Sequence, residues 1–242
     1  MTDLLYMSDS YVREFDAVVT GVTESGQLIL DRTAFYAGGG GQPCDIGKIS
    51  AGNTSWQVTK VSKADGEVVH TIEGDDPPKI GSTVHGELNW ELRYRLMRTH
   101  TALHILCGTV FREYGAQVTG GNMGPDKARM DFELEDLNAD RVAHIEALAN
   151  RAIQAGLPVS WRSLPREEAF QIPDLIRTKI NLLPPGIAEV RVVEIEGLDL
   201  QADGGTHVRN TREVGGLKVI GTRSKGRINK RLEIELVDDS TT

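Results

Sequence analysis

The feature that most constrains this 242-residue chain is the segment RTHTALHIL at residues 98–106, which places His100 and His104 four residues apart. The segment contains no proline or glycine and is rich in leucine and isoleucine, a pattern typical of a helix in a core. Residues four apart on a helix lie on the same face. The two imidazoles therefore predict half of a metal site, and imidazole ligands favour zinc. Two unrelated helix histidines are the alternative.

A second pair of candidate ligands lies about a hundred residues further on, in the sequence QADGGTH. Asp203 and His207 flank a Gly-Gly turn that lets the backbone fold so that both side chains face one point. With the helix pair they give three imidazoles and one carboxylate, a predicted site for one zinc ion. The alternative is that the two pairs, which are distant in sequence, do not meet in the fold and form no metal site. His100 is not followed by the glutamate of HExxH peptidases, which argues against peptidase chemistry.

Composition and charge limit the classes of protein to consider. No run approaches the ~20 apolar residues of a membrane span, and the start lacks a basic and apolar leader, so we expect a cytoplasmic protein with no membrane partner. The net charge of −8 argues against a general polyanion binder. Between Arg209 and Arg231, however, eight basic residues stand against one acid, a local balance of +7. This basic strip predicts a nucleic-acid contact, with a solvated charged face as the alternative.

Residues 1–89 read as short β-prone runs separated by turn residues, and residues 90–242 mix helices with strands. Regularly spaced strands without helices predict a small N-terminal β-barrel or sandwich. In the second part, we expect a helix over 90–114 ended by Gly115, and another over 138–155 between Asn138 and Gly156. The chain is therefore predicted to be α+β, with two domains. The expected strands are residues 17–22, 27–30, 56–61, 67–72, 83–88, 190–195, 217–220 and 232–237.

The first part also contains the sequence TAFYAGGGGQ at residues 33–42. Consecutive glycines let a backbone approach a ligand closely, while a flexible barrel loop is the alternative. No Gly-Lys-Ser/Thr follows, so a phosphate-binding P-loop is not expected.

Four segments together resemble the free-standing alanyl-tRNA editing proteins of the AlaX type, in the longer form with an added N-terminal domain. They are residues 33–42, 98–106, 203–208 and 222–226, and they occur in the family's order over nearly the whole chain. The same modules occur in alanyl-tRNA synthetases, and the editing part is similar to that of threonyl-tRNA synthetases. The resemblance implies an N-terminal β-barrel followed by a zinc-bearing α+β editing domain. It also implies a zinc-dependent deacylase for tRNA(Ala) mischarged with serine, with glycine as a further candidate.

The resemblance also implies the roles of individual residues. His100, His104 and His207 match the family's zinc ligands, while Asp203 stands where the family usually has cysteine. Asp203 therefore either coordinates zinc or orients a neighbouring ligand or water. Thr33 and Gln42 are the implied catalytic residues, although Thr33 can equally be a strand threonine satisfied by backbone. The implied substrate-binding residues are Gly38, Gly39, Gly40, Gly41 and Gln42, and the implied tRNA-binding residues are Arg223, Lys225 and Arg227.

The chemistry of such a substrate is simple, because an aminoacyl ester is already activated. A site that removes serine and spares alanine has to hydrogen-bond the extra hydroxyl. The sequence leaves open whether zinc activates water or holds the substrate's amino group. It also leaves two other functions open: a tRNA-binding module with a structural zinc, and a zinc hydrolase of small esters.

Overall fold

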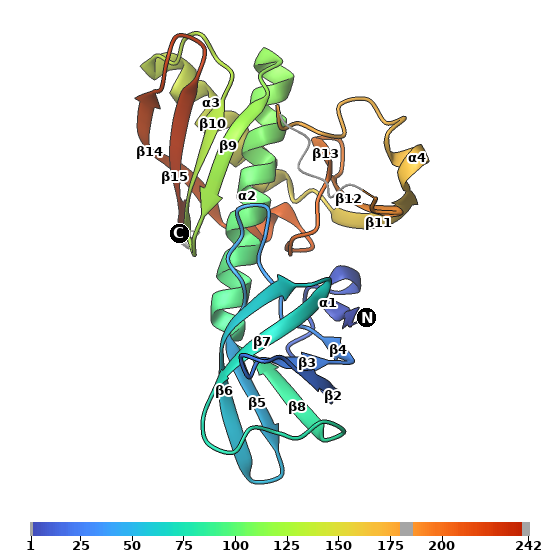
Figure 1. Cartoon of the computed structure of the whole chain (residues 1–242). Coiled ribbons are helices and arrows are strands. Elements are labelled where there is room, and N and C mark those ends of the chain that lie inside the picture. Colours follow the sequence, from blue (N-terminus) through green and yellow to red (C-terminus); the bar gives the residue numbers. More distant parts are fainter. Residues whose placement is uncertain (1, 180–185, 239–242) are drawn as a thin grey trace. The chain divides into compact units, whose positions relative to one another are not determined.

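The computed structural model describes residues 2–179 and 186–238, and the chain forms two compact units, Met1–Tyr94 and Arg95–Thr242 (Figure 1). The first unit is built on a closed barrel of six strands, and the second mixes helices with two antiparallel sheets. The predicted α+β class and the N-terminal barrel are therefore both confirmed. Within the described residues, no helix has the combination of length and apolar character needed to cross a bilayer.

The barrel closes because each of its strands pairs with two antiparallel neighbours, which leaves no free sheet edge. Along the first strand, Phe15, Ala17 and Val19 are buried and alternate with exposed residues, as expected for a strand with one face on a core. A parallel pair, β1 (Asp3–Leu4) with β4 (Arg32–Thr33), and the short helix α1 (Leu5–Ser8) complete the unit. In barrel order the strands are β2 (Glu14–Val22), β3 (Leu28–Leu30), β7 (Glu67–Glu73), β6 (Thr54–Ala64), β5 (Gly47–Ala51) and β8 (Thr83–Leu88).

A buried ion pair holds the first unit together beside the barrel. Arg93 and Asp45 are 0% and 1% exposed, and the guanidinium contacts both carboxylate oxygens. Arg93 also donates to the carbonyls of Ser10 (2.9 Å) and Ala34 (2.5 Å). A buried charge needs hydrogen-bonding partners, and Arg93 takes them from three segments. The segments around Ser10, Ala34 and Asp45 are thereby fixed at one point.

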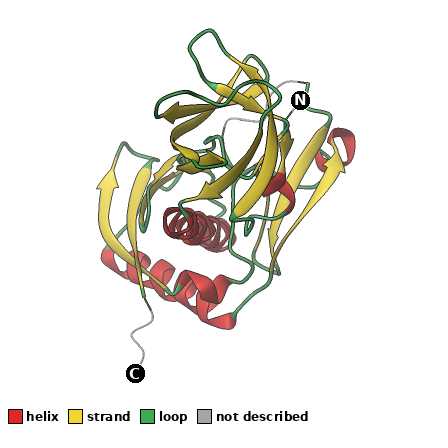
Figure 2. Cartoon of the chain, turned by 90° about the horizontal axis from the view of Figure 1, so that it is seen from below, coloured by secondary structure: helices red, strands yellow, loops and turns green. Residues whose placement is uncertain are grey.

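The second unit contains the helix α3 (Ala139–Ala155) and most of the long helix α2 (Trp90–Tyr114), whose first residues belong to the first unit. Helices are drawn in red in Figure 2, and the larger sheet of this unit has four strands. Asn138 caps the start of α3 with a side chain that accepts from the Arg141 amide, and Gly156, in the left-handed conformation, caps its end. Both ends agree with the predicted caps. The sheet has the order β14 (Gly216–Ser224), β15 (Lys230–Val237), β10 (Lys127–Phe132) and β9 (Val118–Met123).

The second unit also contains a smaller three-stranded antiparallel sheet. Its strands, in order, are β11 (Val159–Pro165), β12 (Glu189–Ile195) and β13 (Asp199–Ala202). One face packs on a small apolar cluster with the helix α4 (Arg166–Ala169). After β13 the chain passes through a turn to the 3₁₀ helix η1 (Thr211–Val214).

Candidate metal centre

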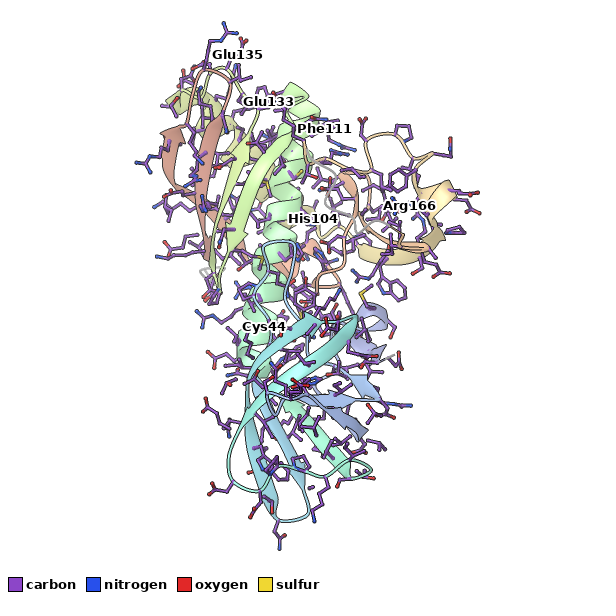
Figure 3. The ribbon with its side chains drawn as sticks, in the orientation of Figure 1. Cys44, His104, Phe111, Glu133, Glu135 and Arg166 are labelled. Carbon is purple, nitrogen blue, oxygen red and sulfur yellow. The ribbon has the colours of Figure 1, made fainter. Side chains whose placement is uncertain are left out.

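Helix α2 supplies the first two candidate ligands. His100 and His104 lie one turn apart along it, and Figure 3 marks His104 on this helix. Their ring centroids are 5.1 Å apart. Ile105 and Leu106 are fully buried, so the helix is fixed by packing at this point. The predicted helix and the shared face of the two histidines are both confirmed.

The second pair, Asp203 and His207, comes from the turn that follows β13. The amide of Gly205 donates to Asp203 Oδ2 at 2.7 Å, which closes the turn. Arg191 of β12 is 6% exposed, and its Nη1 donates to the carbonyls of Asp203 (3.1 Å) and Gly205 (3.0 Å). A buried cation therefore holds this turn in shape, and no pattern in the sequence predicts this role for Arg191.

The two pairs meet in one cluster. One ligand atom from each of His100, His104, Asp203 and His207 lies within 4.8 Å of the others. His207 Nε2 is 3.0 Å from Asp203 Oδ2, and His100 Nε2 is 3.6 Å from Asp203 Oδ1. The side chain of Asp203 is the most exposed of those paired here, at 14%. Three imidazoles and a carboxylate converging on one point form a donor set that fits a divalent metal ion such as zinc.

Each histidine of the cluster has a further hydrogen-bonding partner. Such contacts orient the ring and decide which nitrogen is available to a metal. The partners are a hydroxyl, a carboxylate and a backbone group, in the pairs His207 Nδ1 with Thr101 Oγ1 (3.1 Å), His104 Nδ1 with Asp199 Oδ2 (3.0 Å), and His100 with the backbone of Thr206.

The electrostatics suit metal binding at three of the four members of the cluster. Burial lowers the pKa of His100 to about 4, and burial together with the neighbouring His100 lowers the pKa of His207 well below its usual value. Burial would raise the pKa of Asp203, but the surrounding imidazoles outweigh it and hold that pKa well below its usual range. Burial would lower the pKa of His104, but Asp199 outweighs it and raises that pKa. Neutral imidazoles and an ionised carboxylate are the forms that bind metal, so the shifts at His100, His207 and Asp203 favour binding. At His104 a metal ion has to displace a proton that Asp199 stabilises.

Thr33 lies in the first unit, at the end of β4, and is fully buried. Its hydroxyl accepts from the Phe35 amide at 3.1 Å and lies 2.9 Å from His70 Nε2. His70 Nδ1 in turn faces the Leu28 carbonyl at 3.2 Å, and burial lowers the pKa of His70 to about 4. The Thr33 hydroxyl thus belongs to a buried hydrogen-bond chain, and its role with a substrate stays a prediction.

The four glycines of residues 38–41 all have positive φ angles, of 74°, 139°, 59° and 91° in order. These angles favour glycine, so the run is needed for the path of the backbone. Gly39 and Gln42 exchange two backbone hydrogen bonds of 3.1 and 2.9 Å, and the Tyr36 hydroxyl donates to the Gly39 carbonyl at 3.0 Å. Gln42 is 3% exposed. The loop is therefore a braced turn, and its contact with a substrate also stays a prediction.

Most of the basic strip lies on β14, on β15 and in the turn between them, while Arg209 and Arg212 precede β14. Arg223, Lys225 and Arg227 are all exposed on the hairpin of these two strands. Lys225 Nζ lies 3.1 Å from Asp131 Oδ2, while Arg231 of β15 donates to both oxygens of the same carboxylate at 2.7 and 2.9 Å. Asp131 thus offsets part of the positive charge on one side of the hairpin.

Comparison with known proteins gives two family matches. Residues 8–92 match the model of class II (A) tRNA synthetases, and residues 190–233 match the second additional domain of threonyl and alanyl tRNA synthetases. The second match includes Asp203 and His207, the part of the cluster that lies outside helix α2, and also their neighbours Arg191 and Asp199.

Full-length relatives decide the family. The chain is 40% identical over 245 residues to "Alanyl-tRNA editing protein AlaX-M" of Methanosarcina acetivorans, covering 98% of this chain and 100% of the relative. The protein of the same name from Methanosarcina barkeri is 41% identical, with the same coverage. The chain belongs to the AlaX family of alanyl-tRNA editing proteins. The AlaX chain is also 40% identical to the alanine–tRNA ligase of Ignicoccus hospitalis, over 92% of this chain and 24% of that ligase.

Proposed function

We propose that this AlaX protein is a trans-acting hydrolase that deacylates Ser-tRNA(Ala), with Gly-tRNA(Ala) as a second substrate. The observation that carries the proposal is the buried cluster of His100, His104, Asp203 and His207 in a member of this family. An ester hydrolase needs a place where the carbonyl and a water molecule are held together, and a cluster of metal-binding side chains can provide it.

The proposed cofactor is a single zinc ion bound by the three histidines, with Asp203 as the fourth protein donor. Zinc supplies a Lewis acid that can polarise an ester carbonyl or lower the pKa of a bound water. The chain's own residues keep the donors in place. Thr101 and Asp199 orient the rings of His207 and His104, and Arg191 holds the turn that carries Asp203.

We assign selection of the amino acid to Thr33 and to the loop of residues 38–42. Serine differs from alanine by one hydroxyl, and a site that hydrogen-bonds a hydroxyl can reject the analogue lacking it by up to ~10⁴–10⁵. The braced, glycine-rich turn supports this assignment. Because glycine has no side chain, a ligand can approach the backbone amides of the turn closely.

We assign the tRNA contact to Arg223, Lys225 and Arg227. Their exposure on one hairpin supports a contact with the phosphates of the acceptor end. Such contacts position the nucleic acid and carry no sequence information. Arg223 and Arg227 are the better candidates of the three, because Lys225 is already paired with Asp131.

The test is a deacylation assay with zinc-loaded protein on tRNA(Ala) carrying serine, glycine or alanine. We expect rapid loss of serine, measurable loss of glycine, and retention of alanine. Equal loss of serine and alanine, or no loss of either, would contradict the proposal.

One observation favours a second candidate, a tRNA-binding module with a structural zinc. Four protein donors within 4.8 Å of one another are typical of a closed site, whereas catalytic zinc sites keep one position open. This candidate predicts that the protein binds tRNA(Ala) without hydrolysing the ester, and that removal of zinc unfolds the second unit.

A further inference from the structure

Thr101, Asp199 and the backbone of Thr206 lie outside the cluster and hydrogen-bond its histidines. Asp199 is the charged one among them. Its Oδ2 lies 3.0 Å from His104 Nδ1, and its side chain is 0% exposed. A carboxylate only accepts hydrogen bonds, so a neutral His104 must carry its proton on Nδ1. The lone pair of the ring is then on Nε2, the nitrogen left for the cluster.

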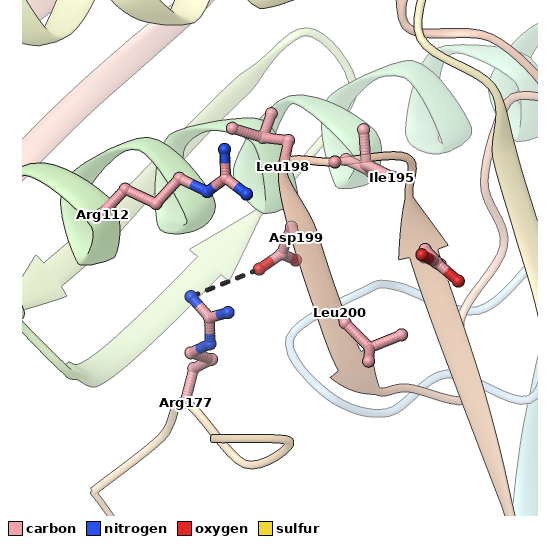
Figure 4. A pocket seen from close by; sticks show the side chains of 8 residues that line it. Arg112, Arg177, Ile195, Leu198, Asp199 and Leu200 are labelled. Carbon is pink, nitrogen blue, oxygen red and sulfur yellow. Dashed lines mark ion pairs between the residues drawn. The ribbon is translucent and has the colours of Figure 1, made fainter. Parts of the chain in front are cut away.

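The carboxylate of Asp199 is hydrogen-bonded at Oδ2 and faces a cation at Oδ1, which has no hydrogen-bond donor among the described residues. Gln201 Nε2 donates to Oδ2 at 2.7 Å, and Arg177 Nη1 faces Oδ1 across 3.7 Å, the ion pair drawn in Figure 4. The guanidinium of Arg177 lies 3.8 Å above the ring of Phe111, a residue of helix α2. Arg177 Nε also donates to the Asp174 carbonyl at 3.0 Å. The cation behind Asp199 is therefore fixed in place.

A glycine in helix α2 allows this arrangement. Gly108 lies one turn after His104, and a Cβ there would come within 2.9 Å of the Leu198 carbonyl and 3.0 Å of Asp199 Cβ. Glycine within a helix costs about 1 kcal/mol relative to alanine. Here it lets the start of β13 approach the helix closely enough for the Asp199 carboxylate to reach His104.

Resting on the function proposed above, we infer that Asp199 is a positioning residue of the metal centre. It holds His104 in the tautomer with Nδ1 protonated and directs Nε2 at the ion, and Arg177 and Gln201 keep its carboxylate in that position. Groups that orient a metal-binding histidine in this way typically change metal affinity by about 10–100-fold.

The experiment measures zinc affinity by competition with a chromogenic chelator, for the parent and for the variants Asp199→Ala, Asp199→Asn and Glu194→Gln. Glu194 is the matched control. Its carboxylate lines the same cavity of about 160 Å³ as Asp199 and Arg177, but it pairs with Arg162 and not with a histidine. We expect about 10–100-fold weaker binding for Asp199→Ala. Asp199→Asn should lose less, because its amide oxygen still accepts from Nδ1. Glu194→Gln should bind as the parent does.

A second readout separates orientation of the ring from general stability. With Co²⁺ in place of zinc, the visible bands report the ligand geometry, so Asp199→Ala should shift them while Glu194→Gln should not. Circular dichroism of the metal-free proteins checks folding. If Asp199→Ala does not fold, Asp199→Asn carries the test through its affinity and its Co²⁺ spectrum.

Two failures can be told apart. If His104→Ala weakens zinc binding while the folded Asp199 variants bind zinc like the parent with an unchanged Co²⁺ spectrum, the role of Asp199 is overturned and the proposed function survives. If the parent itself binds no zinc, the metal-dependent function fails and the role of Asp199 fails with it.

Discussion

Replacing Thr33 by valine tests whether the hydroxyl in the barrel core has the structural role that its contacts indicate. Valine keeps the shape of the side chain and removes the hydroxyl. The Phe35 amide and His70 Nε2, which lie 3.1 and 2.9 Å from Thr33 Oγ1, then lose this partner in a fully buried place. Thr33→Ser is the matched control, because it keeps the hydroxyl and loses only a methyl group.

The expected magnitudes follow from these contacts. Each of the two buried groups left without a partner costs about 1–3 kcal/mol, or about 4 kcal/mol for the two at the middle of this range. The methyl group gained by valine returns about 1 kcal/mol. We therefore expect Thr33→Val to lower the free energy of unfolding of the first unit by about 3 kcal/mol. Thr33→Ser should lower it by about 1 kcal/mol, through the lost methyl.

The assay is urea-induced unfolding, monitored by mass-spectrometric hydrogen exchange. Peptides from the barrel strands report on the first unit separately. Deacylation of Ser-tRNA(Ala) and Ala-tRNA(Ala) is measured on the same samples under conditions where each variant is folded. If Thr33 selects serine, Thr33→Ser keeps the discrimination and Thr33→Val loses it. Equal stability of the two variants would refute the reasoning from the buried hydrogen bonds.

Three further predictions concern separate parts of the chain. Asp45→Asn should cost about 3–5 kcal/mol of unfolding free energy, because it leaves the buried Arg93 charge without its partner; a loss under 1 kcal/mol in urea unfolding would contradict this. His70 has a pKa of about 4 in the fold and an ordinary value of 6.5 when unfolded, so the unfolded chain binds the extra proton between these values. Neutral His70 therefore contributes about 3 kcal/mol to the free energy of unfolding above pH 6.5, and this contribution is lost as the pH falls toward 4. His70→Gln should flatten the pH dependence of stability between these two pH values. Arg223→Gln with Arg227→Gln should weaken tRNA binding and reduce the slope of log affinity against log salt by about 1 per lost phosphate contact, whereas Lys127→Gln, on the neighbouring strand β10, should leave both unchanged.

The long helices were predictable because their signals are local. Asn138 and Gly156 mark the two ends of α3 through their own side-chain and backbone chemistry, and the apolar period between them needs no other part of the chain. Strands without such signals were missed. β9 (Val118–Met123) contains two glycines and β13 (Asp199–Ala202) has four residues, so both depend on pairing with β10 and β12.

The cluster was predictable for a different reason. Each pair has a spacing of four that lets both side chains face one point, and the structure brings the two pairs together. The groups that hold the cluster gave no such signal. Asp199 reaches His104 across 95 positions of sequence, and Arg191 is an ordinary strand residue until its carbonyl contacts are seen. His70 likewise had no partner pattern, and its contact with Thr33 emerges only when the barrel closes.

The central claim, that the histidine and aspartate cluster supports hydrolysis of mischarged tRNA(Ala), is tested most directly by deacylation of Ser-tRNA(Ala) before and after metal removal. The protein is stripped with a chelator, checked for folding, and reloaded with one equivalent of zinc, beside a His104→Ala variant treated in the same way. We predict that stripping abolishes serine release, that zinc restores it in the parent, and that His104→Ala stays inactive. Full activity of the folded, metal-free parent, or of His104→Ala, would contradict the account.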